Sequence, residues 1–459
     1  MPLSSLPPPS SWRYTAEGGA NLVLSFAGSS TSPYAGHALR LRKRKVAEAR
    51  GDAAEAVHGE VETSFGRDIV APLLGQEHLV EMREIALERT WLEELATCMR
   101  AVRPPERQAV DEVDLDARVG VLVEDLIAGD GVLAIEIKPK WGFLPNPAYL
   151  SATTAPTKTS HCRTCMHRFY KRASGAAEQE DGFCPLGLYS GDEGRVRRAV
   201  GTLFSSWESS GGTINNLRFF YERKRVSPDE LQSAVHPLKH ALAACDSSFD
   251  GTRALLTDLL VSALFASPVL RTLATLQATL DAFDIEGLVS LIQACDTAMR
   301  SSPANDLERN LASFAGAQPS LSDWRAFLAR HLPLLSRTAQ CTSLAERHAL
   351  RDGMAASLRR ASEEAGSARD AVLAYLLSAT LKDCSLIVRI PLGAREPGPE
   401  QGDAGEGVQV QIKAIDLDPK PIRRLGKYWR MDGNIVECWR ERLERMTDAE
   451  RTEVRRCVE

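Results

Sequence analysis

Alternating apolar and polar residues dominate the beginning of the chain. Within residues 13–46, the runs 22–26 (LVLSF) and 38–42 (ALRLR) have the two-residue period of β-strands. The pair Gly18-Gly19 lies just before the first of these runs and breaks the pattern as a turn does. We therefore expect a strand, a glycine turn, a second strand, a loop and a third strand.

The pattern changes in the next segments. Residues 79–101 repeat apolar side chains every three to four positions, which predicts one helix. Residues 120–123 and 132–137 are short, almost continuous apolar runs, which predict two further strands. The chain thus begins with a small β-rich unit that includes one helix.

Helical spacing is typical of the second half. Residues 228–300 are rich in leucine and alanine and predict helices, whereas 301–323 contain the serine, proline and asparagine of a linker or surface loop. A helix is expected at about 368–380. Two strands follow at 386–390 and 408–415, and they pair most simply as a hairpin with a long tip.

This order of elements predicts an α+β fold in two lobes. Residues 1–124 would form a β-rich N-terminal lobe, and residues 125–459 a larger C-terminal lobe. The C-terminal lobe would contain a helical insertion at about 228–370 and the hairpin region 380–430.

Composition and charge narrow the class of protein. The 459 residues are 44% hydrophobic and 25% charged, and the net charge of −5 argues against a protein that coats nucleic acid. We find no apolar run of membrane-spanning length and no signal-peptide pattern, so we expect neither a membrane partner nor secretion. Ten scattered cysteines are expected to be reduced thiols in an intracellular compartment. Basic residues nevertheless cluster at 163–172 and 420–430, as a polyanion site requires.

Two lysines in residues 136–145, EIKPKWGFLP, are the most specific feature. Pro139 disfavours a helix between Lys138 and Lys140, and alternation in an extended segment would point both ammonium groups to one side. Two cations on a stiff backbone suit a ligand with several phosphates. The tripeptide KPK alone is common and carries little information.

Aspartates stand at the ends of the predicted hairpin strands. Asp383 precedes the first strand, and Asp416 and Asp418 follow the second. Carboxylates at the ends of paired strands can lie close enough for one to accept a proton and another to bind Mg²⁺. Aspartate is also an ordinary turn residue, and the residues alone leave both interpretations open.

The glycine turn offers a second candidate site. In Gly18-Gly19-Ala20-Asn21, backbone amides can approach a triphosphate closely, and Arg40 on a following strand would supply a cation. No Lys-Ser/Thr pair follows, so this turn is not a P-loop. Most such turns only join strands.

A CxxC pair, Cys162 and Cys165, is flanked by His161 and His167. It supplies two zinc ligands where a structural site needs four, and the histidines are too near in sequence to complete one tetrahedron easily. Cys184 is the only further thiol nearby. On this basis structural zinc is possible but disfavoured.

The string EIKPKWGFLP resembles the signature of the inositol-pentakisphosphate 2-kinase family, and KDCS at 382–385 and DLDPK at 416–420 resemble two further motifs of it. We expect a fungal member. The resemblance extends over separate blocks, 14–42, 120–221 and 380–430. Plant members carry a zinc site in the helical insertion, with a second CxxC-like motif that this chain lacks.

The resemblance implies a two-lobed, protein-kinase-like or inositol polyphosphate kinase-like fold and the cofactors ATP and Mg²⁺. It implies phosphorylation of the 2-hydroxyl of inositol 1,3,4,5,6-pentakisphosphate to inositol hexakisphosphate (phytate). Asp383 takes the catalytic position, with Asp416 and then Asp418 as metal ligands. The implied ATP contacts are Gly18, Gly19, Ala20, Asn21, Arg40, Glu124, Leu126 and Asp416, with 124–126 as the hinge that binds adenine. The implied substrate contacts are Arg107, Lys138, Lys140, Lys171, Asn215, Asn216, Lys420, Arg424 and Tyr428.

Some of these assignments depend on geometry that a sequence does not fix. Lys420, Arg424 and Tyr428 are spaced four apart and would form one stripe if their segment were helical. Arg103 competes with Arg107 for a contact from the first lobe, and we rank Arg107 ahead. A kinase of another inositol phosphate stays an alternative. A zinc-stabilised nucleic-acid-binding protein is a more distant one, which the negative net charge disfavours. We expect a monomer in the nucleus or cytoplasm.

Overall fold

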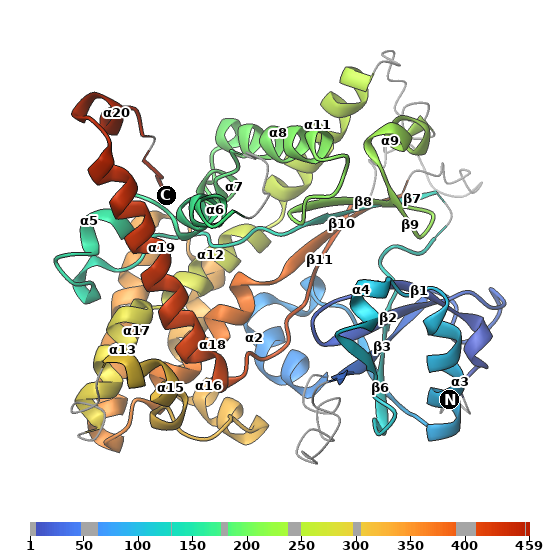
Figure 1. Ribbon diagram of the computed structural model, residues 1–459, viewed down its shortest axis with the longest axis horizontal. Helices are drawn as coiled ribbons and strands as arrows, with labels where there is room; N and C mark the ends of the chain where they lie inside the picture. The colour runs from blue at the N-terminus through green and yellow to red at the C-terminus, as the bar shows by residue number, and fades with distance from the viewer. Residues whose placement is uncertain are drawn as a thin grey trace.

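The fold combines two antiparallel β-sheets with a large group of helices (Figure 1). The computed structural model describes residues 6–46, 63–129, 131–175, 182–236, 249–296, 304–391, 410–454 and 456–459. The expected α+β class is confirmed.

The first sheet is made by the beginning of the chain. Its strand order is β1 (Trp12–Glu17), β2 (Asn21–Phe26), β3 (His37–Lys45), β6 (Val119–Glu124), β4 (Met82–Ala86), and β5 (Asp111–Val113) also pairs with β3. Helix α3 (Arg89–Arg100) packs on this sheet and shares its hydrophobic core. The strands expected in 13–46 and at 120–123 are confirmed.

The prediction of a single helix over 79–101 is wrong for its first half. Met82 to Ala86 form strand β4, which pairs with β6, and only Arg89–Arg100 are α-helical. Met82 and Ile85, three apart, lie on opposite faces of this strand, and each packs in a different hydrophobic cluster. Pairing with the neighbouring strand β6 decides for a strand over a helix.

The second sheet is formed by segments from three distant parts of the chain. Its order is β11 (Gln411–Ile415), β10 (Ser385–Pro391), β7 (Val132–Ile137), β8 (Leu217–Tyr221), β9 (Lys224–Val226). The predicted strands at 132–137 and 386–390 and the hairpin pairing of β10 with β11 are confirmed. The second hairpin strand begins at Gln411, and the expected residues 408 and 409 lie outside the described ranges.

The two faces of the second sheet have different roles. On β7, Leu133, Ile135 and Ile137 point into the main hydrophobic core. Ala134 lies on the opposite face, where it packs with Leu126 and other residues of the connection between the sheets. We call this opposite face the hinge face. Because side chains alternate along a strand, Glu136 also belongs to the hinge face. The candidate active-site residues gather where β7 ends on this face.

Helices fill the rest of the molecule. The longer ones are α6 (Arg163–Ala173), α8 (Glu193–Ser209), α11 (Phe249–Ala266), α12 (Val269–Leu280), α13 (Asp284–Cys295), α15 (Ala304–Phe314), α16 (Leu321–Leu335), α17 (Leu344–Ala365), α18 (Arg369–Lys382) and α19 (Leu425–Arg445). Short ones are α2 (Ala71–Leu74), α4 (Pro105–Gln108), α5 (Ala155–Lys158), α7 (Pro185–Leu188), α9 (Pro228–Ala234), α20 (Asp448–Glu453), the π-helix η4 (Gly66–Val70), and the 3-10 helices η1 (Pro9–Ser11), η5 (Gln76–His78), η6 (Pro147–Tyr149), η7 (Ser336–Gln340) and η8 (Ile422–Arg424). Buried side chains of α8, α12 and α18 share one core with the second sheet. The helical prediction for 228–370 is confirmed in the described residues.

The interpretation of 301–323 as a linker or surface loop is wrong for residues 304–314 and for 321–323, which begin the next helix; 315–320 are not helical, and 301–303 lie outside the described ranges. Ala304–Phe314 form helix α15, whose Leu307 and Leu311 are buried in the main core. Of the residues that suggested a loop, Pro319 and Ser320 lie between α15 and α16, and Ser320 is the N-cap of α16.

One segment of the expected first lobe packs with the second. Phe65 is fully buried against Trp324 of α16, with ring centroids 5.2 Å apart. Further along, the backbone oxygen of Leu79 accepts a hydrogen bond from Lys413 of β11 at 2.9 Å. Residues 63–79 therefore share the main hydrophobic core with the helices and the second sheet (Figure 1). The division into lobes at residue 124 stays a prediction.

Within the described ranges, each helix taken singly is too short or too polar to cross a membrane. Gly251–Ala266 and Val269–Cys295 together reach the required length and hydropathy, with a bend of 59° between them.

Candidate active site

Lys138 is placed by the strand that precedes it. Because Glu136 and Lys138 lie two apart at the end of β7, both side chains occupy the hinge face. The ammonium group of Lys138 donates to the hydroxyl of Ser385 at 2.7 Å and lies 3.5 Å from the buried carboxylate of Glu136. The same carboxylate accepts hydrogen bonds from Ser385 at 2.8 Å and from Arg218 at 3.2 Å. Lys138 is thus held by a small polar network of protein groups.

Lys140 reaches the same region by a different backbone. Its φ is 62°, so the expected extended alternation stops before it and does not explain its direction. Its carbonyl is fixed by Tyr189 and by Gln277, at 3.2 and 3.0 Å. Burial and the nearby ammonium of Lys138 both lower the pKa of Lys140. The ammonium groups of the two lysines are therefore neighbours, as expected. The backbone turn at Lys140, and not the alternation of an extended strand, brings them together.

Asp383 caps the end of helix α18, directly before β10. Its carboxylate accepts a hydrogen bond from Lys420 at 2.6 Å. Desolvation alone would raise the pKa of Asp383, but its side chain is 60% exposed, and the charges of Lys420, Lys140 and Lys138 lower the pKa below its ordinary value. The group is an ionised carboxylate among cations, open to solvent.

Asp416 and Asp418 follow the other hairpin strand. Asp416 has a φ of 60°, and its carboxylate lies 3.4 Å from the ammonium of Lys138. Asp418 is turned towards the first sheet, where Arg40 donates to both its carboxylate oxygens at 3.1 and 2.9 Å. Among the described residues, these aspartates do not converge on one point as a ready set of three ligands.

Arg40 and Asn21, the last residue of the glycine turn, lie beside Asp418. The side chain of Asn21, at the start of β2, lies 3.3 Å from Asp418. Neither Gly18 nor Gly19 has a positive φ, and a Cβ atom at either position would meet no described atom within 4 Å. Neither backbone conformation nor local packing therefore requires glycine there. The space above the turn is open to a ligand.

The connection between the sheets begins at the end of β6. Glu124 is the last residue of β6 and lies 4.0 Å from Arg389, whereas Leu126 is buried on the hinge face. The amide of Asp125 donates to Gly36, and its carboxylate accepts from the amide of Ile127. The backbone of Leu126 makes no hydrogen bond to any described residue.

Several predicted substrate residues surround Lys138 and Lys140. The amide of Lys138 donates to the backbone oxygen of Asn216 at 3.0 Å, and Asn215 accepts from Arg218 at 2.6 Å. Lys171, on α6, is near enough for its charge to lower the pKa of Lys140. These residues join the cluster from two other segments.

The remaining predicted residues lie further out. The expectation of one helical stripe is wrong, because Lys420 precedes η8 between two prolines and α19 begins only at Leu425. Arg424 is exposed at the end of η8, and Tyr428 is half-buried on α19. Arg103 is buried in ion pairs with Glu17 and Asp111, at 2.6 Å each, which leaves the exposed Arg107 as the candidate of that segment.

A buried pair behind Asp383 escaped the sequence analysis. Lys382 is 4% exposed, pairs with Asp281 at 2.5 Å, and lies 4.0 Å from the ring centre of Trp141. A charge in such a place needs a partner, and the aromatic ring adds a cation–π contact. The pair fixes the residue next to Asp383 and the aromatic residue next to Lys140. The lysine in KDCS was a signal that could have suggested it.

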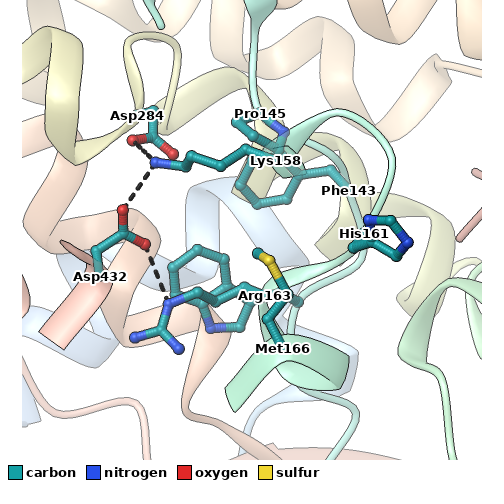
Figure 2. A pocket seen from close by; sticks show the side chains of 9 residues that line it. Phe143, Pro145, Lys158, His161, Arg163, Met166, Asp284 and Asp432 are labelled. Atoms are coloured by element: carbon teal, nitrogen blue, oxygen red, sulfur yellow. Dashed lines mark hydrogen bonds and ion pairs between the residues drawn. The ribbon is translucent and has the colours of Figure 1, made fainter. Parts of the chain in front are cut away.

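A second buried network braces the signature segment (Figure 2). Lys158 lies between the carboxylates of Asp284 and Asp432, at 2.5 and 2.8 Å, and Arg163 approaches Asp432 at 3.2 Å. Burial opposes the charged form of Lys158, but the two carboxylates outweigh it and raise its pKa. The network ties α5, α6, α13 and α19 together beside Phe143.

Comparisons with known proteins agree with the motifs. A family model described as inositol-pentakisphosphate 2-kinase matches residues 14–434. An inositol-pentakisphosphate 2-kinase of Cryptococcus neoformans var. neoformans serotype D is 33% identical over 439 residues, which cover 94% of each chain. The inositol-pentakisphosphate 2-kinase of Arabidopsis thaliana is 24% identical over 490 residues, 96% of each chain. The match extends through both sheets and the helices between them, so the chain belongs to the inositol-pentakisphosphate 2-kinase family.

Proposed function

We propose that this protein transfers the γ-phosphoryl group of ATP to the 2-hydroxyl of inositol 1,3,4,5,6-pentakisphosphate, which forms inositol hexakisphosphate. The observation that carries the proposal is the position of Asp383, an ionised carboxylate with Lys138, Lys140 and Lys420 around it. A carboxylate can accept the hydrogen of an attacking hydroxyl, and cations can hold the phosphates of a highly charged acceptor. Family membership supplies the reaction.

We further propose that the two sheets are the lobes of a protein-kinase-like enzyme with ATP between them. The open turn at Gly18-Gly19 would cover the triphosphate with Ala20 and Asn21, and Arg40 would bind a phosphate. The segment from Glu124 to Leu126 would bind adenine. The unbonded backbone of Leu126 supports this role, since an adenine ring is held in such hinges by backbone donors and acceptors.

Asp416 and Asp418 are proposed to hold Mg²⁺ together with the nucleotide. Protein Mg²⁺ sites of this kind use one or two carboxylates, and phosphate oxygens and water complete the octahedron. The divergent aspartates suit that arrangement, because the nucleotide brings the missing ligands. When bound, the ion would neutralise charge on the transferred phosphoryl group. Arg40 must then leave Asp418, and a phosphate is the natural new partner for its guanidinium.

Asp383 is proposed to orient and deprotonate the 2-hydroxyl. Its lowered pKa keeps it ionised at neutral pH, so it can always accept the hydrogen bond. Phosphoryl transfer depends on positioning and charge neutralisation more than on strong base catalysis. The other phosphates of the acceptor would be bound by Arg107, Lys138, Lys140, Lys171, Asn215, Asn216, Lys420, Arg424 and Tyr428.

The test is a product analysis. The purified chain is incubated with ATP, Mg²⁺ and inositol 1,3,4,5,6-pentakisphosphate, and the inositol phosphates are separated by anion-exchange chromatography. We expect one new peak that co-elutes with inositol hexakisphosphate, and none when Mg²⁺ is chelated. Parallel reactions with inositol tris- and tetrakisphosphates test the alternative. A higher kcat/KM for one of these would assign the enzyme another acceptor, and no transfer to any of them would refute the proposed activity.

A further inference from the structure

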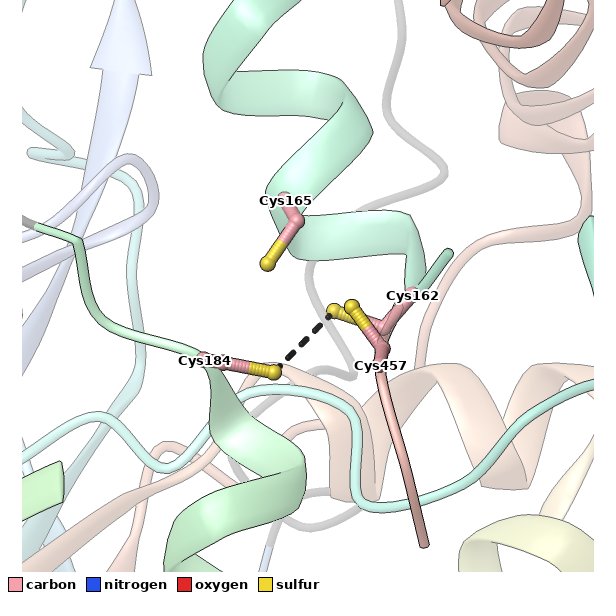
Figure 3. A group of neighbouring side chains, drawn as sticks. All are labelled: Cys162, Cys165, Cys184 and Cys457. Carbon is pink, nitrogen blue, oxygen red and sulfur yellow. Dashed lines mark hydrogen bonds between the residues drawn. The ribbon is translucent and has the colours of Figure 1, made fainter. Parts of the chain in front are cut away.

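Four cysteines, none of them among the proposed active-site residues, meet at one point (Figure 3). Their sulfur atoms all lie within 4.8 Å of one another. Cys162 and Cys165 come from the start of α6, Cys184 directly precedes α7, and Cys457 belongs to the last residues of the chain. The two flanking histidines are not members of this group, since His161 packs on Trp439 and His167 on Tyr170.

The spacing of the sulfur atoms fits a tetrahedral metal site. A zinc ion bound to four sulfurs at about 2.3 Å has sulfur-to-sulfur edges of about 3.8 Å. The sulfur atoms of Cys162 and Cys184 are 3.8 Å apart. A disulfide would require about 2.05 Å between two sulfurs and would leave no reason for the other two to converge. None of these four cysteines forms a disulfide with a described residue.

The fourth cysteine is brought to this point by contacts of its own. The amide of Cys457 donates to the backbone oxygen of Ser160 at 2.9 Å, just before α6. Arg195 of α8 donates to the carbonyl oxygens of Val458 and Glu459. The segment 456–459 is thus anchored at Cys457 and at the two residues after it, and the thiol is presented at a fixed place.

The surroundings suit a negatively charged centre. Four thiolates around one Zn²⁺ carry a net charge of −2. The guanidinium of Arg168 donates to the sulfur of Cys165 at 3.8 Å. An adjoining cavity of about 710 Å³ is lined by three of the four cysteines and by Arg168, Arg172, Arg195, Arg198, Arg442 and Arg456, with Glu450 as its one acidic residue among those described. Positive surroundings favour thiolates over thiols.

We propose that Cys162, Cys165, Cys184 and Cys457 bind one structural zinc ion. Binding replaces the four thiol protons, which pass to solvent, and no redox change is involved. With four protein ligands the ion has no open position, so it stabilises the fold and takes no part in catalysis. The ion clamps residues 456–459 onto the beginning of α6, the helix that carries Lys171 towards the proposed substrate site.

The experiment measures metal in the full-length protein. We expect about one zinc per chain by elemental mass spectrometry after purification without chelator, and loss of most of it in Cys457→Ser. The matched control is Cys438→Ser, a half-buried cysteine on α19 outside the group, which should keep its zinc. Hydrogen exchange should become faster in 456–459 and at the start of α6 in Cys457→Ser only.

A measurement on the unaltered chain covers the case in which Cys457→Ser does not fold. Replacement of the metal with Co²⁺ should give the intense visible and near-ultraviolet bands of tetrahedral cobalt thiolate. Each of three results would overturn the proposal: no stoichiometric zinc and no such bands, a disulfide between any two of the four cysteines in peptides mapped without reduction, or a normal zinc content in a folded Cys457→Ser protein. None of these readouts depends on kinase activity, so failure here is distinguishable from failure of the proposed function.

Discussion

Replacement of Asp383 by asparagine tests the proposed reaction most directly. Asparagine has the same shape, so the change removes the charge and the ability to accept a proton. It also removes the ion pair with Lys420, in which nitrogen and oxygen are 2.6 Å apart. The variant therefore removes two roles of the carboxylate at once, one in holding the fold and one in the reaction, and their magnitudes have to be compared.

The structure decides which of the two effects is larger. Two unit charges at 2.6 Å interact by about 1.6 kcal/mol at the dielectric constant of water, and the 60% exposure of Asp383 makes that limit the relevant one. The cost of ordering two side chains reduces the net contribution of such pairs to about 0–1 kcal/mol. A positioned general base contributes about 10²–10⁴-fold in rate, or about 3–5 kcal/mol in the barrier. Catalysis should therefore suffer far more than stability.

We expect Asp383→Asn to lower kcat by at least about 100-fold. The thermal midpoint and ATP affinity should be almost unchanged, as measured by a melting curve and by nucleotide titration. Asp116→Asn is the control, since Asp116 is 63% exposed and forms ion pairs with Arg44 and Arg89 at 3.1 and 2.8 Å, in the connection between β5 and β6 of the first sheet. It should keep full activity. A kcat of Asp383→Asn within threefold of the unaltered enzyme would refute the assignment of Asp383.

Three further predictions concern ATP, packing and pH. Arg40→Ala should raise the KM for ATP by about 10–100-fold, the worth of a charge-assisted hydrogen bond, and leave the KM for inositol pentakisphosphate unchanged. An unaltered KM for ATP in this variant would refute the proposed contact of Arg40 with a phosphate. Gly426→Ala should destabilise the fold by about 2–3 kcal/mol in urea unfolding, because the new Cβ would lie 2.1 Å from a backbone oxygen of α15. In the control Gly433→Ala, on the same helix, the new Cβ meets nothing within 4 Å, so the change should be neutral or slightly stabilising. Burial alone would raise the pKa of Asp370, but hydrogen bonds from a histidine and an arginine outweigh this effect and lower the pKa to about 2. The protein should therefore lose about 2 kcal/mol of unfolding free energy as pH falls from about 5 to below 2. The Asp370→Asn variant should not show this loss.

Local patterns predicted the sheets well. The strands at 132–137 and 386–390 were recognisable because each is a short apolar run bounded by turn residues. The errors arose where local signals are ambiguous. The apolar spacing in 79–101 suggested one helix, although Met82–Ala86 form a strand, and the composition of 301–323 did not reveal the helix at Ala304–Phe314. In both places tertiary packing decided the outcome.

The candidate site was predictable as a set of residues and not as an arrangement. Motif resemblance indicated Lys138 and Asp383, but the partners that hold them come from the order of strands in the second sheet. Glu136 was the recoverable clue, since a lone carboxylate inside an apolar strand has to be paired. Cys457 was not recoverable, because nothing near it in sequence connects it with Cys162.

The ion pairs of the site suggest how binding and reaction are connected. Two cations of the proposed site are paired with carboxylates: Lys138 with Glu136 and Asp416, and Lys420 with Asp383. Like charges this close would otherwise repel one another. A polyphosphate acceptor offers Lys420 a more highly charged partner than a single carboxylate. In the proposed complex Lys420 therefore turns to a phosphate, and this exchange releases Asp383 to accept the hydrogen of the 2-hydroxyl at the moment the acceptor is in place.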